Sequence, residues 1–185
     1  MVLTTWEWTR ASGLISFFLL FLSILAGLWH STPTVKKAWK TRLFFFHQTI
    51  GWLGFLVIIF HAMILLYDQY VSYRWYEVFL PFMSDEHRLL VGIGTLAFYG
   101  IFLILLSSDM MKKVGRSLWK KIHLFSLPAY LLALVHGTLL GTDRTSSFMQ
   151  LIYTGTSILL LITYLLKRRS GGSQRRIMAR EVDSS

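Results

Sequence analysis

Five long apolar runs constrain the fold of this chain more than any other feature of its sequence. A helix needs about 20 residues to cross a hydrocarbon core of about 30 Å, and each run approaches or exceeds that length. The runs cover residues 11–29, 43–67, 89–108, 122–141 and 148–166. The sequence therefore predicts an all-α membrane protein whose residues 1–169 form a bundle of five transmembrane helices. Residues 170–185, which lack apolar periodicity, are predicted to be a flexible cytoplasmic tail.

The basic residues predict how this bundle is oriented. Of the 19 lysines and arginines, 15 fall in the loop after the first run, the loop after the third run and the tail. The other loops hold Arg10, Arg74, Arg88 and Arg144. By the positive-inside rule, the amino end lies outside and the carboxyl end lies in the cytoplasm, in a multi-pass protein of the cytoplasmic membrane. The net charge of +10 is then an orientation signal in the lipid bilayer, and nucleic-acid binding is not expected.

Four histidines lie inside the apolar runs and carry the functional prediction. His47 and His61 are in the second run, and His123 and His136 are in the fourth. At a rise of 1.5 Å per residue their separations become about 21 and 20 Å, so they form two pairs at two depths. Ionisable groups in a membrane are costly and commonly functional, and neutral imidazole is a good ligand for iron. The pattern predicts an inner six-coordinate haem on His47 and His123 and an outer one on His61 and His136.

Two other uses of these histidines stay open. The four side chains can be separate hydrogen-bonded packing residues, or they can form a proton relay in a bundle without haem. No Asp or Glu lies between the paired histidines, and relays commonly use carboxylates, so the sequence favours haem. The chain has no cysteine, which excludes iron–sulfur clusters and covalent attachment of haem. His30 and His87 are interpreted as interfacial residues.

The direction of the imidazoles depends on a proline. Fourteen residues at about 100° each place His61 about 40° from His47, on one face of a helix. Thirteen residues leave His136 about 140° away from the direction of His123. Pro128 lies between them, and it removes a backbone hydrogen bond and clashes with the preceding turn. A kink or local rewinding is therefore expected there, and the haem hypothesis needs it.

Other residues are expected to support the haems. Their anionic propionates need basic partners near the interface. The candidates are Arg10 and Arg88 at the outer level and Lys40, Arg42 and Lys121 at the inner level, and Arg10 is preferred because it is almost alone within an apolar flank. Gly51 and Gly54 allow either the close approach of a macrocycle or tight helix packing, two alternatives that the sequence does not separate.

These motifs resemble a known family. The spacings His-x13-His and His-x12-His, together with WEWTRASGL at the start, LWKKIH at 118–123 and LVHGTLLGTD at 134–143, are similar to short bacterial members of the ferric reductase-like transmembrane domain family. That family includes the membrane cores of ferric reductases and NADPH oxidases and the haem subunit of a bacterial methionine sulfoxide reductase system. The resemblance implies a helical bundle with bis-histidine b haems. Many relatives have six spanning helices, and the flavin and nicotinamide domains of the oxidases have no counterpart here.

The expected function is electron transfer across the membrane by a dihaem b-type cytochrome. Without flavin or nicotinamide domains, the resemblance implies a separate donor, either a cytosolic flavoprotein reductase or membrane quinol. The acceptor is external and unidentified, with ferric iron as an example, so an oxidoreductase activity of its own is an open question. The alternative is a haem-bearing membrane anchor that conducts electrons to or from a catalytic site in a partner protein.

Overall fold

The structure of the chain, a computed structural model, describes residues 4–68, 73–141 and 145–183, with side chains up to residue 169. Within these ranges it is helical without strands, and five segments are long and apolar enough to cross a membrane. They are Thr5–His30, Lys37–Leu65, Arg88–Asp109, Arg116–Leu140 and Ser147–Arg169. The predicted all-α bundle of five transmembrane helices is confirmed. Arg144 and the last two residues of the 134–143 motif lie outside the described residues, and the orientation of the termini stays a prediction.

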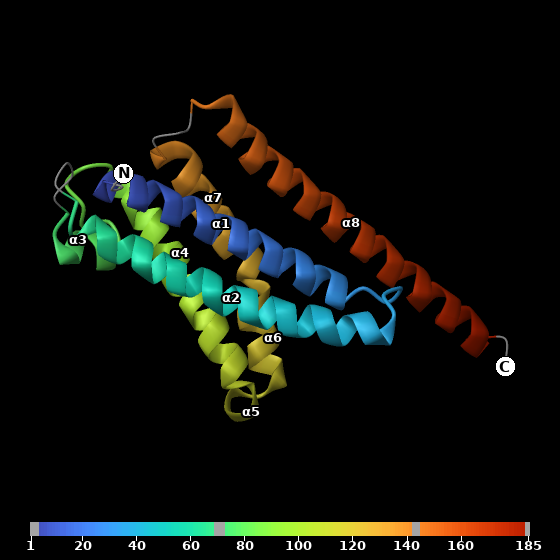
Figure 1. Ribbon diagram of the computed structural model, residues 1–185. Coiled ribbons are helices and arrows are strands. Elements are labelled where there is room, and N and C mark those ends of the chain that lie inside the picture. The colour runs from blue at the N-terminus through green and yellow to red at the C-terminus, as the bar shows by residue number, and fades with distance from the viewer. Residues whose placement is uncertain (1–3, 69–72, 142–144, 184–185) are drawn as a thin grey trace.

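Helices α1 (Thr5–His30) and α2 (Lys37–Leu65) form an antiparallel hairpin that packs along its whole length (Figure 1). The turn between them is held by His30, whose Nδ1 lies 2.9 Å from the carbonyl oxygen of Lys40. Gly51 and Gly54 are buried against α1: a Cβ on Gly51 would lie 3.2 Å from Ser23 Oγ, and one on Gly54 would lie 3.3 Å from Leu19 Cβ. These two glycines therefore serve tight helix packing, one of the two alternatives that the sequence left open.

The fourth membrane span is broken in the middle, as its proline predicts. Helix α6 (Arg116–Leu124) ends and α7 (Ser126–Leu140) begins on either side of Phe125. The N–H of Phe125 donates to the carbonyl of Ile122, and the N–H of Ala129 donates to Phe125. Pro128 has no N–H to offer the carbonyl of Leu124, so the regular hydrogen-bond ladder cannot continue there. Helix α7 packs against α4 (Arg88–Asp109), which connects to α6 through the short α5 (Met111–Val114).

Helix α8 (Ser147–Asp183) lies at the edge of the bundle, against α1 and α7 (Figure 1). It extends well beyond the predicted end at residue 166 and continues as a helix through the segment predicted to be a tail. The flexibility of that tail, and the domain boundary at residue 170, stay predictions. Its side chains lie outside the described residues.

The core lies between the two histidine levels. Phe55 falls between His47 and His61 along α2, and Tyr130 falls between His123 and His136 along the fourth span. Phe17 of α1 stacks on Tyr130 with ring centroids 5.1 Å apart, and Phe55 stacks on Phe98 at 5.4 Å. These aromatic rings fill the middle of the bundle.

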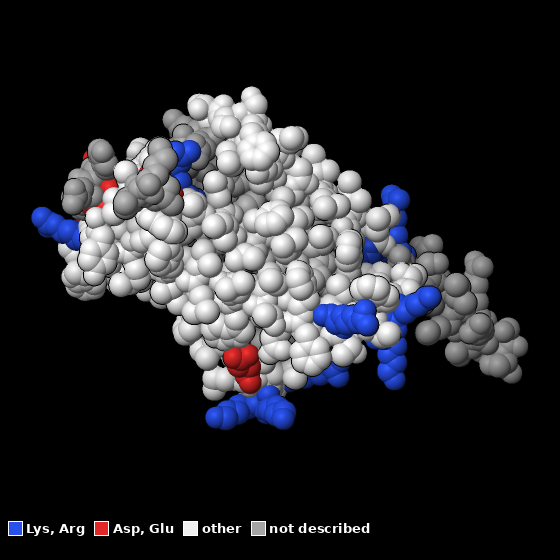
Figure 2. Space-filling view, viewed as in Figure 1, with Lys and Arg blue, Asp and Glu red and all other residues white. Residues whose placement is uncertain are grey.

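The outer surface of the bundle is apolar between charged ends. Large exposed side chains such as Leu56, Leu131 and Leu161 face outward, and Figure 2 shows an uncharged belt with lysines and arginines gathered toward its ends. An apolar belt of this kind is expected where helices meet lipid tails. The chain is therefore a multi-pass membrane protein.

A short segment at residues 73–87, here called the outer cap, packs onto α4. It contains α3 (Trp75–Phe79), and its main chain is tied down by α4: Thr95 Oγ1 donates to the carbonyl of Val78 and the Tyr99 hydroxyl donates to that of Phe79, both at 2.9 Å. Buried Glu77 joins the two ends of the cap, because it accepts the backbone N–H of Arg74 at 2.7 Å and that of Asp85 at 3.1 Å.

Replacing Glu77 with glutamine is expected to loosen the outer cap. The N–H groups of Arg74 and Asp85 lower the pKa of the Glu77 carboxyl below its ordinary value of 4.5. The carboxylate therefore stabilises the cap fully above pH 4.5, and this stabilisation is lost as the pH falls through the lowered pKa. Hydrogen–deuterium exchange should show several-fold faster exchange of residues 73–87 in Glu77→Gln at pH 7, with α8 unchanged. Equal protection in both proteins would contradict the assignment.

Candidate functional site

The rings of the inner pair of histidines lie close to each other. The ring centroids of His47 on α2 and His123 on α6 lie 5.9 Å apart, and the ring planes are inclined by 81°. Trp119, one turn before His123, lies over its imidazole at 5.2 Å and donates its Nε1–H to Ser108 Oγ at 3.1 Å. The tryptophan is thus tied to α4 and packs against His123.

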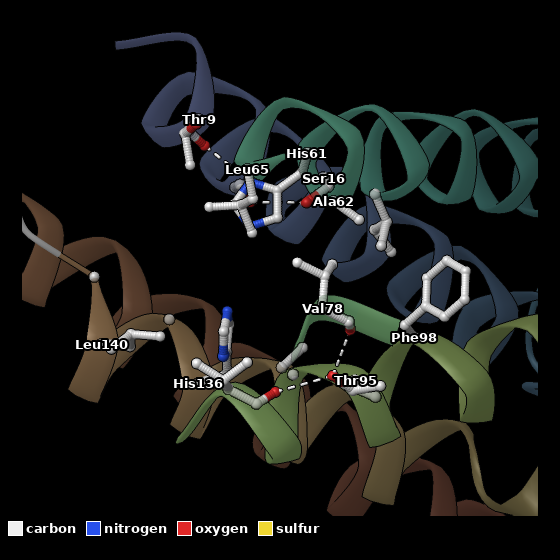
Figure 3. Close-up of a pocket in the computed structure, with 18 of the residues that line it drawn as sticks. Thr9, Ser16, His61, Ala62, Leu65, Val78, Thr95, Phe98, His136 and Leu140 are labelled. Atoms are coloured by element: carbon white, nitrogen blue, oxygen red, sulfur yellow. Dashed lines mark hydrogen bonds between the residues drawn. The ribbon is translucent and has the colours of Figure 1, made fainter. Parts of the chain in front are cut away.

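The outer pair faces across a cavity of about 370 Å³. His61 from α2 and His136 from α7 lie on opposite walls, and Figure 3 shows their rings directed toward the space between them. Val78 and Phe79 of the outer cap close one side, and Phe17 and Phe98 close the deep end toward the core. The volume is in the ordinary range of cofactor pockets. Both predicted pairs are therefore brought together, at two levels of one bundle.

Main-chain carbonyls fix the orientation of three imidazoles. The Nδ1 atom of His47 lies 2.7 Å from the carbonyl oxygen of Ser23, that of His61 lies 2.9 Å from Thr9, and that of His136 lies 2.8 Å from Leu90. A carbonyl oxygen only accepts, so each Nδ1 carries the proton and donates it. The Nε2 lone pair is then free, which is the tautomer and orientation that a metal-binding histidine needs.

His123 differs from the other three histidines. Its Nδ1 is buried and has no hydrogen-bond partner among the residues that the structure describes. The inner level therefore has one imidazole anchored to a carbonyl, whereas the outer level has two. The two levels have the same candidate ligands, two histidines each, but they differ in how many of the Nδ1 atoms are hydrogen-bonded to a carbonyl.

Arg10 is the predicted basic residue that reaches the outer cavity. It lines the cavity wall together with Trp6, and its guanidinium lies over the Trp6 ring at 4.1 Å. Arg88, the other outer candidate, is exposed and donates from Nε to the carbonyl of Phe82. At the inner end, Arg42 lies over Trp39 at 5.2 Å, and Lys121 is exposed. Arg10 is thus better placed for an anionic group in the cavity than Arg88.

Helix α1 was predicted to contribute only Arg10 to the site, yet it also supplies the carbonyls of Thr9 and Ser23. Sequence reasoning from side-chain chemistry does not find such contacts, because the acceptor is the main chain and any residue type offers one. The same holds for Leu90 on α4. Within the described ranges no three His, Cys, Asp or Glu side chains form a cluster that would hold a bare metal ion.

Comparison with known proteins identifies a family for this chain. The family described as "Ferric reductase like transmembrane component" matches residues 12–134, which include His47, His61 and His123 and end just before His136. No curated protein and no solved structure matches the chain. The family match covers more than half of the sequence. The chain therefore belongs to the ferric reductase-like transmembrane family, whose shared element is a membrane core for electron transfer that generally holds haem b.

Proposed function

We propose that this protein is a dihaem b-type cytochrome of the cytoplasmic membrane that transfers electrons between its two faces. His47 and His123 hold the inner haem, and His61 and His136 hold the outer one. The observation that carries the proposal is the presence of two facing imidazole pairs, separated by an aromatic core, in a chain of this family. Porphyrin supplies four further nitrogen ligands, so two histidines at each level complete the coordination of iron.

The separation of the inner pair supports this role. With metal–nitrogen bonds of about 2.0–2.1 Å, two imidazoles that shared one iron would have ring centres about 6 Å apart. The 5.9 Å between His47 and His123 agrees with that distance.

The outer cavity supports the proposal of a second haem. Anchored Nδ1 atoms leave the Nε2 atoms of His61 and His136 as ligands, and Leu14, Phe17 and Phe98 give the cavity apolar wall area for a macrocycle. Arg10 lines the same cavity and is proposed to pair with a propionate. The bound group supplies one-electron exchange. The chain would orient it and would hold its iron with two histidines, which favours electron transfer over direct binding of oxygen.

The donor is proposed to lie on the cytoplasmic side. Most basic residues belong to the loops and tail assigned to that side, and they suit docking of an acidic flavoprotein reductase; membrane quinol is the other donor considered. Electrons then leave at the outer haem for an external acceptor, such as ferric iron.

Haem quantitation tests the proposal. Protein purified from cells supplied with haem should show a b-type Soret spectrum and about two haems per chain in a pyridine haemochrome assay. Because the group is not covalently attached, acid acetone should extract all of it. A fully folded, colourless protein would sink the proposal.

A further inference from the structure

A glycine lies against each of three candidate ligands. A Cβ built on Gly13 would lie 3.2 Å from Cε1 of His61, and one on Gly27 would lie 3.2 Å from Cε1 of His47. On α4, a Cβ on Gly94 would lie only 2.6 Å from Nδ1 of His136. The imidazole rings thus occupy the space that a side chain would otherwise take.

These glycines stand in a fixed relation to the carbonyls. Each one follows the accepting residue by four positions: Gly13 follows Thr9, Gly27 follows Ser23, and Gly94 follows Leu90. In an α-helix the side chain of residue n+4 points toward the N-terminus and lies over residue n. It therefore covers the carbonyl oxygen of residue n on the side that faces a neighbouring helix. Glycine leaves the second lone pair of the carbonyl oxygen open to a neighbouring helix.

The hairpin of α1 and α2 contains two copies of this contact. Gly13 and Gly27 are 14 residues apart, and so are His47 and His61. Because the helices are antiparallel, Gly13 meets His61 at the outer level and Gly27 meets His47 at the inner level. The same arrangement recurs on α4 at Gly94, where a different helix presents the histidine. Three independent occurrences of one geometry argue against ordinary small-residue packing.

We propose that Gly13, Gly27 and Gly94 are positioning residues for the haem ligands, an inference that rests on the function proposed above. Each glycine opens a carbonyl to which an imidazole Nδ1–H donates, and this bond fixes the tautomer, aims Nε2 at the iron and raises the basicity of the ligand. A methyl group at any of these positions pushes the ring off the carbonyl. The ligand then donates less electron density, and ferrous haem is favoured at that level alone.

The test is redox titration of the two haems in alanine variants. Gly13→Ala should shift the midpoint potential of the outer haem upward and leave the inner one unchanged, and Gly27→Ala should do the reverse. Gly94→Ala, with the shortest contact, should shift or lose the outer haem. The wave that disappears in His61→Ala identifies the outer haem. Gly100→Ala on α4 and Gly155→Ala on α8 are matched controls, because a Cβ there meets only an ordinary contact at 3.5 Å or nothing within 4 Å.

The outcomes separate this proposal from the function on which it rests. Alanine ordinarily stabilises a helix interior relative to glycine, so a level-specific shift of potential without a drop in thermal stability supports positioning. Two haems with wild-type potentials in all three variants would overturn the proposal and leave the function intact. Equal loss of both haems in each variant would also overturn it, since that result indicates general packing. A wild-type protein without haem would overturn both.

Discussion

Replacing His61 with alanine is expected to leave about one haem per chain, with the inner haem intact. His61 and His136 face the same outer cavity, whereas His47 and His123 lie close to each other at the other end of the aromatic core. A haem that loses one of its two protein ligands loses coordination and is released, because no covalent bond holds it. The measurement is haem per chain by pyridine haemochrome, together with the number of waves in a redox titration.

The reciprocal variant makes this prediction specific. His47→Ala should remove the inner haem and keep the outer one. The redox wave that remains in His47→Ala should therefore be the wave that is missing in His61→Ala. His30→Asn serves as a control, because His30 holds the turn between α1 and α2 and lies outside both pairs. Loss of both haems in either ligand variant would contradict the two-level arrangement.

The helices and the histidine pairs were predictable because they follow from the apolar lipid environment and from the repeat of the α-helix. Long apolar runs become helices in lipid, where every backbone polar group needs an internal partner. Two histidines 14 residues apart necessarily share a face of a helix such as α2. The meeting of His136 with His61 was less certain, since it depends on a bend whose size the sequence does not set.

Contacts made by the main chain were not predictable in the same way. Nothing in the residue types Thr9, Ser23 and Leu90 marks their carbonyls as acceptors. The sequence does show that Gly13 and Gly27 are as far apart as the two histidines of α2. That each glycine meets a histidine follows only from how α1 and α2 are aligned, which the sequence does not give. The outer cap was also missed, because a five-residue helix such as α3 is too short to produce a periodic signal.

Replacing Pro128 with alanine is expected to reduce the inner haem and spare the outer one. Alanine restores the N–H that can bond to the carbonyl of Leu124, and it removes a penalty of about 3 kcal/mol for a continuous helix. A continuous helix points His123 and His136 about 140° apart, so one of them must turn away from its partner.

The structure indicates which histidine turns. Helix α7 is held by Ala129 and Tyr130 in the core and by the bond from His136 to Leu90. Helix α6 is tied to α4 by the part-buried bond from Trp119 to Ser108, but it contains no buried residue among those described, and the Nδ1 of His123 has no hydrogen-bond partner there. The rotation should therefore fall on α6, and the inner haem should drop by roughly half or more, given the size of the proline effect. Pro128→Gly is the matched control: it also restores the N–H, but glycine disfavours a continuous helix by about 1 kcal/mol relative to alanine, so it should retain more inner haem. If Pro128→Ala binds both haems at wild-type potentials, packing and not the proline maintains the break at Phe125.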